Sequence, residues 1–254
     1  MTMPQIISIH SFRRGTGKTT IALALAGVLA QRGKRVCLID TDISSPGLHI
    51  LLGLSEIRAE CFLNDFLEER CSITEAVIDL TDGLPASVPG RIFLVPSNPS
   101  PAVAMQTRWD REAADRLTDG YYELDQAFNL DVIFVDTHAG ITEESIAALA
   151  TTDIATIILR PDQQDYQGTA LLVDLARNLG IERLAVIVNE LSSGYDPRQA
   201  SESIQETYKA QIVGVLPHSE ELMMTGGRGP FPLQHPEHPL TAVFTQITDR
   251  LIQA

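Results

Sequence analysis

The chain has 254 residues, 44% of them hydrophobic, with 33 acidic and 19 basic side chains and a formal net charge of −14. This length and composition provide enough apolar material for one large core without help from disulfides. The negative charge has the wrong sign for electrostatic attachment to DNA or anionic lipid. It therefore disfavours nucleic acid as a partner, although a local basic patch stays possible.

The three cysteines, Cys37, Cys61 and Cys71, are odd in number, and their spacing fits neither a CxxC redox pair nor a zinc pair. We expect packing or surface thiols in a reducing compartment. The first residues lack the features of a signal peptide, and the apolar run from Ile21 to Ala30 is shorter than the roughly 20 residues that cross a bilayer. These features predict a cytoplasmic protein.

Short, nearly continuous apolar runs recur along the chain, as is typical of strands that helices cover on both faces. The expected strands are Ile6–His10, Val36–Asp40, Ile92–Pro96, Val132–Asp136, Ala155–Arg160, Ala185–Asn189 and Ile212–Leu216. The expected helices are Lys18–Arg32, Thr169–Asn178 and Ala242–Ile252. This alternation predicts a doubly wound α/β fold with a mostly parallel sheet of about seven or eight strands.

Segments rich in Pro and Gly, at 82–90, 96–101 and 226–239, are interpreted as turns and loops between elements rather than long linkers. The chain shows no internal repeat and no heptad pattern. We therefore expect residues 1–254 to form a single domain. The stretch 56–90 gives no clear prediction.

The glycine-rich segment from Gly15 to Thr20 follows the first expected strand and opens the first expected helix. In such a unit, backbone N–H groups at the helix start bind phosphate oxygens, and glycines let the loop curl closely. Lys18 would neutralise β- and γ-phosphate charge, while the Thr19 hydroxyl would ligate Mg²⁺. The segment predicts Mg-ATP binding rather than a plain turn, although Phe12 stands where the strict G-x-x-x-x-G-K-[ST] pattern has its first glycine.

Two more expected strands end in acids. Asp40 and Asp42 lie two residues apart, so their carboxylates point to the same side of an extended chain. One can organise metal-bound water while the other orients the attacking water. The run from Val132 to Asp136 is typical of a Walker B strand, whose acid would hold Mg²⁺ through water. For Asp40 and Asp42, the alternative is that they only terminate a strand.

The box from Ser11 to Thr20 resembles the deviant Walker A motif of the MinD/ParA family of dimerising P-loop ATPases. That box normally begins Lys-Gly-Gly, and its first lysine, the signature lysine, reaches across an ATP-sandwiched dimer to the partner's phosphates. Arg13 stands at the signature position, where a guanidinium can contact phosphate with two donors. Arg14 stands where the family box has a glycine. This larger side chain is expected to affect the dimer geometry, the rate of hydrolysis and the cross-dimer role of Arg13. Solvated surface charge is the alternative for both arginines.

The motifs and the resemblance together imply a set of site residues, with ATP or ADP and Mg²⁺ as cofactors. The catalytic set is Lys18, Arg13, Asp40 and Asp42, in which Asp42 orients water and Asp40 supports it. The cofactor-binding set is Arg14, Gly15, Thr16, Gly17, Lys18, Thr19, Thr20, Asn189 and Pro217, with Asn189 pairing with adenine unless it is an ordinary turn former. The metal ligands are Thr19, Asp136 and Asp40.

The segment from Thr137 to Gly140 is similar to the family's second switch loop. Gly140 is expected to move toward a γ-phosphate. We interpret His138 as a loop residue that forms hydrogen bonds and leave it out of the catalytic set.

Three functions stay open. The first is a positioning or partitioning ATPase that closes as an ATP-dependent homodimer and is released when a protein partner stimulates hydrolysis. The second, suggested by Arg14, is a nucleotide-dependent switch that recruits another protein with little or no hydrolysis. The third is a metabolic P-loop enzyme, which is disfavoured because no substrate-binding insertion is evident. Residues 248–254 do not resemble the basic amphipathic helix of membrane-bound relatives, so no membrane anchor is expected.

Overall fold

The computed structural model describes residues 3–54, 59–224 and 229–253. Within them, an eight-stranded sheet has the order β3-β4-β2-β5-β1-β6-β7-β8. Every neighbouring pair is parallel except β3 and β4. The strands are β1 (Gln5–His10), β2 (Arg35–Asp40), β3 (Ile78–Asp79), β4 (Arg91–Val95), β5 (Val132–Asp136), β6 (Ile154–Leu159), β7 (Arg183–Leu191) and β8 (Gln211–Pro217). The predicted fold class is confirmed, and each predicted strand lies within two residues of an observed one.

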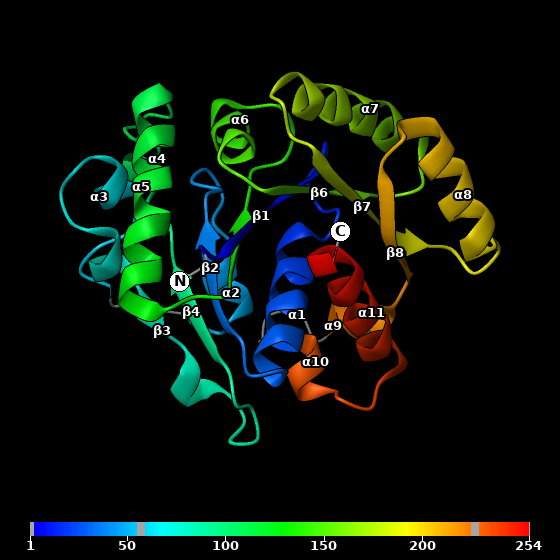
Figure 1. Cartoon of the computed structure of the whole chain (residues 1–254), viewed down its shortest axis with the longest axis horizontal. Coiled ribbons are helices and arrows are strands. Elements are labelled where there is room, and N and C mark those ends of the chain that lie inside the picture. Colours follow the sequence, from blue (N-terminus) through cyan, green and yellow to red (C-terminus); the bar gives the residue numbers. More distant parts are fainter. Residues whose placement is uncertain (1–2, 55–58, 225–228, 254) are drawn as a thin grey trace.

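Helices cover both faces of this sheet (Figure 1). On one face lie α1 (Lys18–Gln31), α10 (Phe231–Gln234) and α11 (Pro239–Gln253). The other face carries α5 (Arg111–Phe128), α6 (Glu143–Ala150), α7 (Gln163–Asn178) and α8 (Pro197–Tyr208). Shorter segments are α2 (Leu48–Leu51), α3 (Leu63–Leu67), α4 (Pro101–Ala104), α9 (Glu220–Met224) and the 3-10 turns η1 (Ile73–Ala76) and η2 (Thr81–Gly83).

The strand β5 shows why continuous apolar runs are needed here. Val132 and Phe134 pack into the core beneath α1, whereas Ile133 and Val135 pack beneath α5 and α6. Successive side chains of a strand point to opposite faces. A strand covered on both faces must therefore be apolar at every position, which is the pattern that indicated a parallel sheet.

Two predicted helices begin earlier than expected. The helix predicted from Thr169 is the second half of α7, which begins at Gln163 because the Asp162 carboxylate caps it, accepting from the backbone N–H of Gln164 and Asp165 at 3.1 Å each. The residues of this first turn are polar, so the spacing of apolar residues did not reveal it. The helix predicted from Ala242 begins at Pro239.

Regions predicted as loops also contain structure. The segment 226–239, predicted as turns and loops, contains α10, and the stretch 56–90, for which no clear prediction was made, contains α3, η1, β3 and η2. Residues 56–58 and 226–228 of these regions lie outside the described residues. In the part of the chain that is described, no helix combines the length and apolarity needed to span a bilayer.

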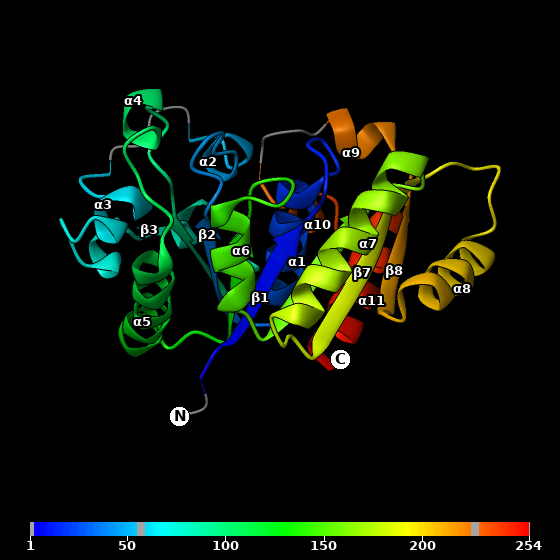
Figure 2. The same ribbon diagram turned by 90° about the horizontal axis from the view of Figure 1, so that it is seen from above.

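The strand order determines where a ligand can bind. β1 lies between β5 and β6 at the centre of the sheet, and Asp40 of β2 is in register with Asp136 of β5. In Figure 2 the chain rises from the N-terminus through β1 to the upper edge, along which α2 and α9 lie. Ligands of open α/β sheets bind beyond the carboxyl ends of the strands, where the strand order reverses. The loops after β1, β2 and β5 meet at this edge.

Candidate nucleotide site

The loop between β1 and α1 curls tightly because Gly15 and Gly17 adopt positive φ angles of 74° and 94°. A Cβ atom on Gly17 would lie 2.5 Å from Nδ2 of Asn189. That same nitrogen donates a hydrogen bond to the Thr16 carbonyl oxygen at 2.8 Å. The loop is therefore held by β7 as well as by its own glycines. The predicted pairing of Asn189 with adenine stays a prediction.

Lys18, the first residue of α1, is only 8% exposed, yet its ammonium forms no hydrogen bond or ion pair with any described residue. Burying an ammonium without acceptors is unfavourable. Burial, and to a smaller extent the positive charge of Lys18, lowers the pKa of His10 to about 3. The side chain thus lacks the anionic partner that a phosphate group provides.

Asp136 presents a free oxygen close to the same loop. Its Oδ2 accepts a hydrogen bond from the Thr19 hydroxyl at 2.7 Å, whereas its Oδ1 is buried without a partner among the described residues. Burial raises the pKa of Asp136 to about 6, although Lys18 and Thr19 oppose the shift. A carboxylate beside a hydroxyl suits Mg²⁺, which takes oxygen ligands, so these residues fit the predicted metal.

Asp40 organises the loop that follows β2. Its Oδ2 accepts from the backbone N–H of Gly47 and of Leu48 at 3.0 Å each, and its Oδ1 accepts from the N–H of Asp42 at 3.2 Å. Burial and the neighbouring Asp136 raise the pKa of Asp40 well above its ordinary value. The carboxylate therefore fixes the turn that carries Asp42, and its predicted part in metal binding stays a prediction.

Comparison with known proteins identifies the family. Residues 7–233 match the CobQ/CobB/MinD/ParA nucleotide binding domain. The chain belongs to this family. The septum site-determining protein MinD of Bacillus subtilis is 27% identical over 257 residues, which cover 98% of this chain and 90% of the relative.

Solved structures agree with the assignment to the CobQ/CobB/MinD/ParA family. The MinD cell division protein of Aquifex aeolicus has a TM-score of 0.80 at 26% identity, covering 98% of this chain and 97% of its own, and its MinC:MinD complex gives the same score and identity. MinD of Pyrococcus horikoshii, complexed with Mg-ADP, has a TM-score of 0.82 at 21% identity, covering 98% and 96%, which is a likeness of fold.

Arg13, which is predicted to stand at the signature position, is bound to α7 of its own chain. Its Nε donates to Oδ1 of Asp165 at 2.5 Å, its Nη1 donates to Oε1 of Gln164 at 2.7 Å, and its Nη2 pairs with Asp162. The Asp165 side chain is 2% exposed and that of Arg13 is 32% exposed. The bond to Asp165 is the main cause that raises the pKa of Arg13. A contact across a dimer requires these bonds to break first.

Arg14, the other departure from the family box, is linked to Asp42 through His138. Arg14 Nη2 lies 3.2 Å from His138 Nε2, and His138 Nδ1 lies 2.7 Å from Asp42 Oδ1. A guanidinium can only donate, so Nε2 accepts, and the proton on Nδ1 is donated to Asp42. The His138 ring therefore joins the phosphate loop to the predicted water-orienting acid. His138 does form hydrogen bonds, as predicted, but its partnership with Asp42 was missed because the two residues are 96 positions apart.

Phe12 also has a structural explanation. A Cβ atom on Gly168 of α7 would lie 2.0 Å from Cγ of Phe12, so the ring packs directly on the helix backbone. The aromatic residue that breaks the strict glycine pattern thus anchors the loop to α7. A glycine inside a helix marks such a close approach, but the predicted helix began at Thr169, so Gly168 gave no such signal.

The remaining predicted residues are placed as follows. Thr16 is buried between the two glycines of the loop, and Thr20 is half-buried in the first turn of α1. Gly140 has a φ of 89°, and its N–H donates to the Ser11 carbonyl oxygen at 2.8 Å, which connects the predicted second switch loop to the segment before the phosphate loop. Pro217 is exposed at the carboxyl end of β8, in register with Leu191.

Proposed function

We propose that this chain is an ATPase that binds and hydrolyses Mg-ATP, forms an ATP-dependent homodimer and acts in the spatial positioning or partitioning of a cellular cargo. The observation that carries the proposal is that two buried groups of opposite charge beside the phosphate loop each have unused binding capacity. Among the described residues, the Lys18 ammonium forms no hydrogen bond or ion pair, and Asp136 Oδ1 accepts no hydrogen bond. Mg-ATP would satisfy both groups at once.

The residues of the site would have separate roles. Lys18 and the N–H groups that follow Gly15 bind the phosphates, and Thr19 with Asp136 holds the metal. Mg²⁺, when bound, neutralises charge on the β- and γ-phosphates. Asp40 contributes by holding the loop in place, because its oxygens already accept three backbone hydrogen bonds.

Asp42 would orient the attacking water, with His138 and Arg14 as positioning residues. The hydrogen bond from His138 fixes one carboxylate oxygen of Asp42 and leaves the other free to accept from water. Replacing His138 with alanine should therefore lower kcat by roughly ten- to a hundredfold, as the loss of an orienting partner does elsewhere, and leave the affinity for ATP within about twofold. Loss of ATP affinity in parallel with kcat would instead show that His138 supports the loop as a whole.

Residues 1–254 would act as one P-loop ATPase domain in the cytoplasm. A protein partner that stimulates hydrolysis is favoured over nucleic acid because the net charge is −14. The MinD protein of Aquifex aeolicus is known in complex with MinC, which is a precedent for a protein partner.

Three variants test the ATPase proposal. Lys18→Ala should abolish nucleotide binding measured by calorimetry, because nothing else at the loop supplies a flexible ammonium. Asp42→Ala should keep binding and lose steady-state turnover. Asp174→Ala, which removes an exposed carboxylate of α7 away from the loop, is the matched control and should behave as the wild type. A wild-type rate no higher than that of Asp42→Ala contradicts the ATPase proposal.

That contrary result would favour the second function, a nucleotide-dependent switch that recruits a protein with little hydrolysis. The retention of Arg13 by Asp165 supports this alternative, because the signature side chain is not free to reach a partner's phosphates. Light scattering after size exclusion, in ADP and in a non-hydrolysable ATP analogue, tests the dimer itself. Monomer in both nucleotides removes the dimer from either function.

A further inference from the structure

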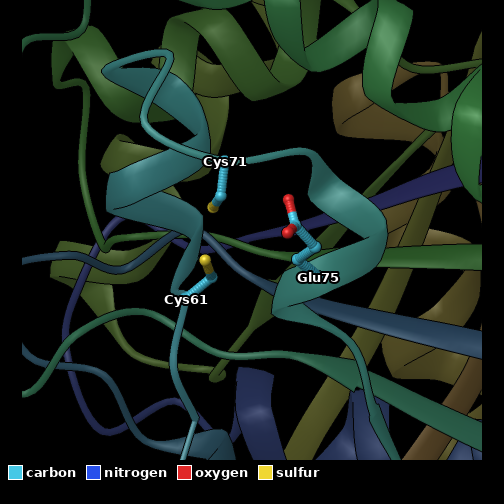
Figure 3. A group of neighbouring side chains, drawn as sticks. All are labelled: Cys61, Cys71 and Glu75. Carbon is cyan, nitrogen blue, oxygen red and sulfur yellow. The ribbon is translucent and has the colours of Figure 1, made fainter.

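A second group of reactive side chains lies around α3, on the face of the sheet that carries α5. Cys61 precedes α3, Cys71 follows it and Glu75 lies in η1. One ligand atom from each of the three residues lies within 4.8 Å of the other two. Figure 3 shows the two sulfur atoms facing each other and the carboxylate pointing toward the space beside them. The cysteine spacing in the sequence indicated no metal pair, but the fold brings these ligands together.

The turn around α3 explains the proximity. α3 has only five residues, and Asp65 caps it by accepting from the N–H of Phe62 at 3.0 Å. Glu69 then adopts a φ of 57°, and the chain reverses so that the Arg70 N–H reaches the Asp65 carbonyl oxygen at 2.8 Å. The Arg70 side chain also donates to Asp65 at 2.9 Å. Residues before and after the helix are therefore held side by side by bonds that do not use the thiols.

Glu75 is oriented as metal-ligating carboxylates usually are, through a bond from a neighbour. Its Oε2 accepts from the backbone N–H of Ser72 at 2.8 Å and from the Ser72 hydroxyl at 2.9 Å. These bonds lower the pKa of Glu75, so it is ionised at neutral pH. Among the described residues nothing donates to Oε1, which is left to bind a cation.

The two thiols are half-buried and unoxidised. Burial, with further contributions from Cys61 and from the carboxylates of Asp65 and Glu75, raises the pKa of Cys71 to about 12. An isolated Cys71 thiol is therefore protonated and unreactive, and a bound cation would replace its proton.

We propose that Cys61, Cys71 and Glu75 bind one zinc-type divalent cation that fastens α3 to η1. Two sulfur ligands and one oxygen select zinc over Mg²⁺, which requires oxygen ligands, so the site would not compete for the nucleotide's metal. With zinc–sulfur bonds of about 2.3 Å, tetrahedral ligand atoms lie about 3.8 Å apart, which small side-chain rotations can reach from the present arrangement. Binding releases a proton from each thiol, and water fills the fourth position.

The expected role is structural. Phe66 of α3 and Ile73 of η1 pack on Gly120 of α5, where a Cβ atom would lie within 2.9 Å of both side chains. A cation that joins the two segments would hold this packed pair together. The proposal does not depend on ATP hydrolysis, so its test is separate from the tests of the phosphate loop.

The reduced full-length protein, stripped with a chelator, would be titrated with Zn²⁺ against a chromophoric competitor and with Co²⁺ in an absorption spectrometer. We expect one ion per chain, a thiolate-to-cobalt charge-transfer band and a higher Tm with Zn²⁺. Cys61→Ser and Cys71→Ser should each weaken binding at least tenfold, and Glu75→Gln should weaken it by about tenfold. Cys37→Ala and Glu68→Gln are matched controls, since Cys37 is fully buried in the core and Glu68 is an exposed acid of the same segment.

If the reduced chain shows no thiolate-to-cobalt band when Co²⁺ is added, the proposal is overturned. This holds whether or not the two thiols can be oxidised to a disulfide. Binding that survives in Glu75→Gln and in both serine variants, each checked for folding by circular dichroism, overturns it as well. Glu75 is exposed, so Glu75→Gln keeps the test informative if a cysteine variant fails to fold.

Discussion

The bond between Arg13 and Asp165 should oppose dimer closure, and its removal should favour the ATP-bound dimer. If Arg13 reaches across a dimer to phosphate, closure must first break its bonds to α7 and leave the Asp165 carboxylate buried without its cation. Asp165→Asn removes the negative charge while keeping the size of the side chain. It also keeps an oxygen that can accept from the Arg160 N–H, which lies 3.1 Å from Asp165 in the native chain.

The size of the effect follows from the geometry of the pair. A hydrogen bond between charged groups contributes about 1.5 to 3 kcal/mol. The Arg13 side chain is 32% exposed, so solvent screening places the effect below this range, at about fivefold in the equilibrium constant for each bond. A symmetric dimer breaks the bond twice, so the dimer of Asp165→Asn should be at least roughly 30-fold tighter.

Sedimentation velocity over a concentration series, in a non-hydrolysable ATP analogue and in ADP, measures the dimer Kd of both chains. The gain should appear only with the analogue, and it should vanish when Asp165→Asn is combined with Arg13→Ala, because the bond is then already absent. Thermal melts report whether the variant is folded. A gain that persists without Arg13, or no gain in a folded Asp165→Asn, refutes the reasoning and leaves Arg13 as a residue that only anchors the loop.

Three further predictions follow from single positions. Gly17→Ala should weaken nucleotide binding at least fivefold, as measured by calorimetry. A positive φ costs alanine about 1 kcal/mol or more, and its Cβ would lie 2.5 Å from the Asn189 amide of β7. Gly194→Ala is the control and should have no effect, because a Cβ atom at Gly194 would lie in open space. Gly168→Ala should lower Tm by roughly 3 to 10 °C through overpacking against Phe12, and truncating that ring to alanine in the same chain should recover part of the loss. Because the pKa of His10 is lowered to about 3, the unfolded chain binds its proton first as the pH falls, so this residue's stabilising contribution is complete above about pH 6.5 and is lost toward pH 3. Urea unfolding from pH 7 to pH 4 should show a shallower loss of stability in His10→Asn, and parallel profiles for the two chains would contradict this.

The strands were predictable because each is a local pattern. A run such as Val132 to Asp136 is apolar at every position until it reaches the acid that ends it, and both features follow from burial on two faces and exposure at the edge of the sheet. The phosphate loop was predictable for the same reason, since glycine, lysine and threonine at fixed spacing form a local unit.

Helices with polar first turns or broad charged faces were harder to predict. α5 escaped prediction, although its buried residues Ala113, Leu117, Tyr121 and Leu124 recur at helical spacing and Asp110 caps its start. Its exposed face is strongly charged, and the tertiary contacts with η1 and α3 decide its place. Apolar content alone underestimates such a helix, because only one stripe of it is buried.

The sequence by itself determined that this chain folds as a doubly wound nucleotide-binding domain with its phosphate loop after the first strand. Only the tertiary structure decided that Arg13 binds Asp165, 152 positions away, that Arg14 reaches Asp42 through His138, and that Cys61 faces Cys71. The physical reason is that strands and phosphate loops are specified by interactions between near neighbours in the chain. Contacts between distant side chains depend on which strands lie side by side and on how tightly the connecting turns close, and no local pattern encodes either.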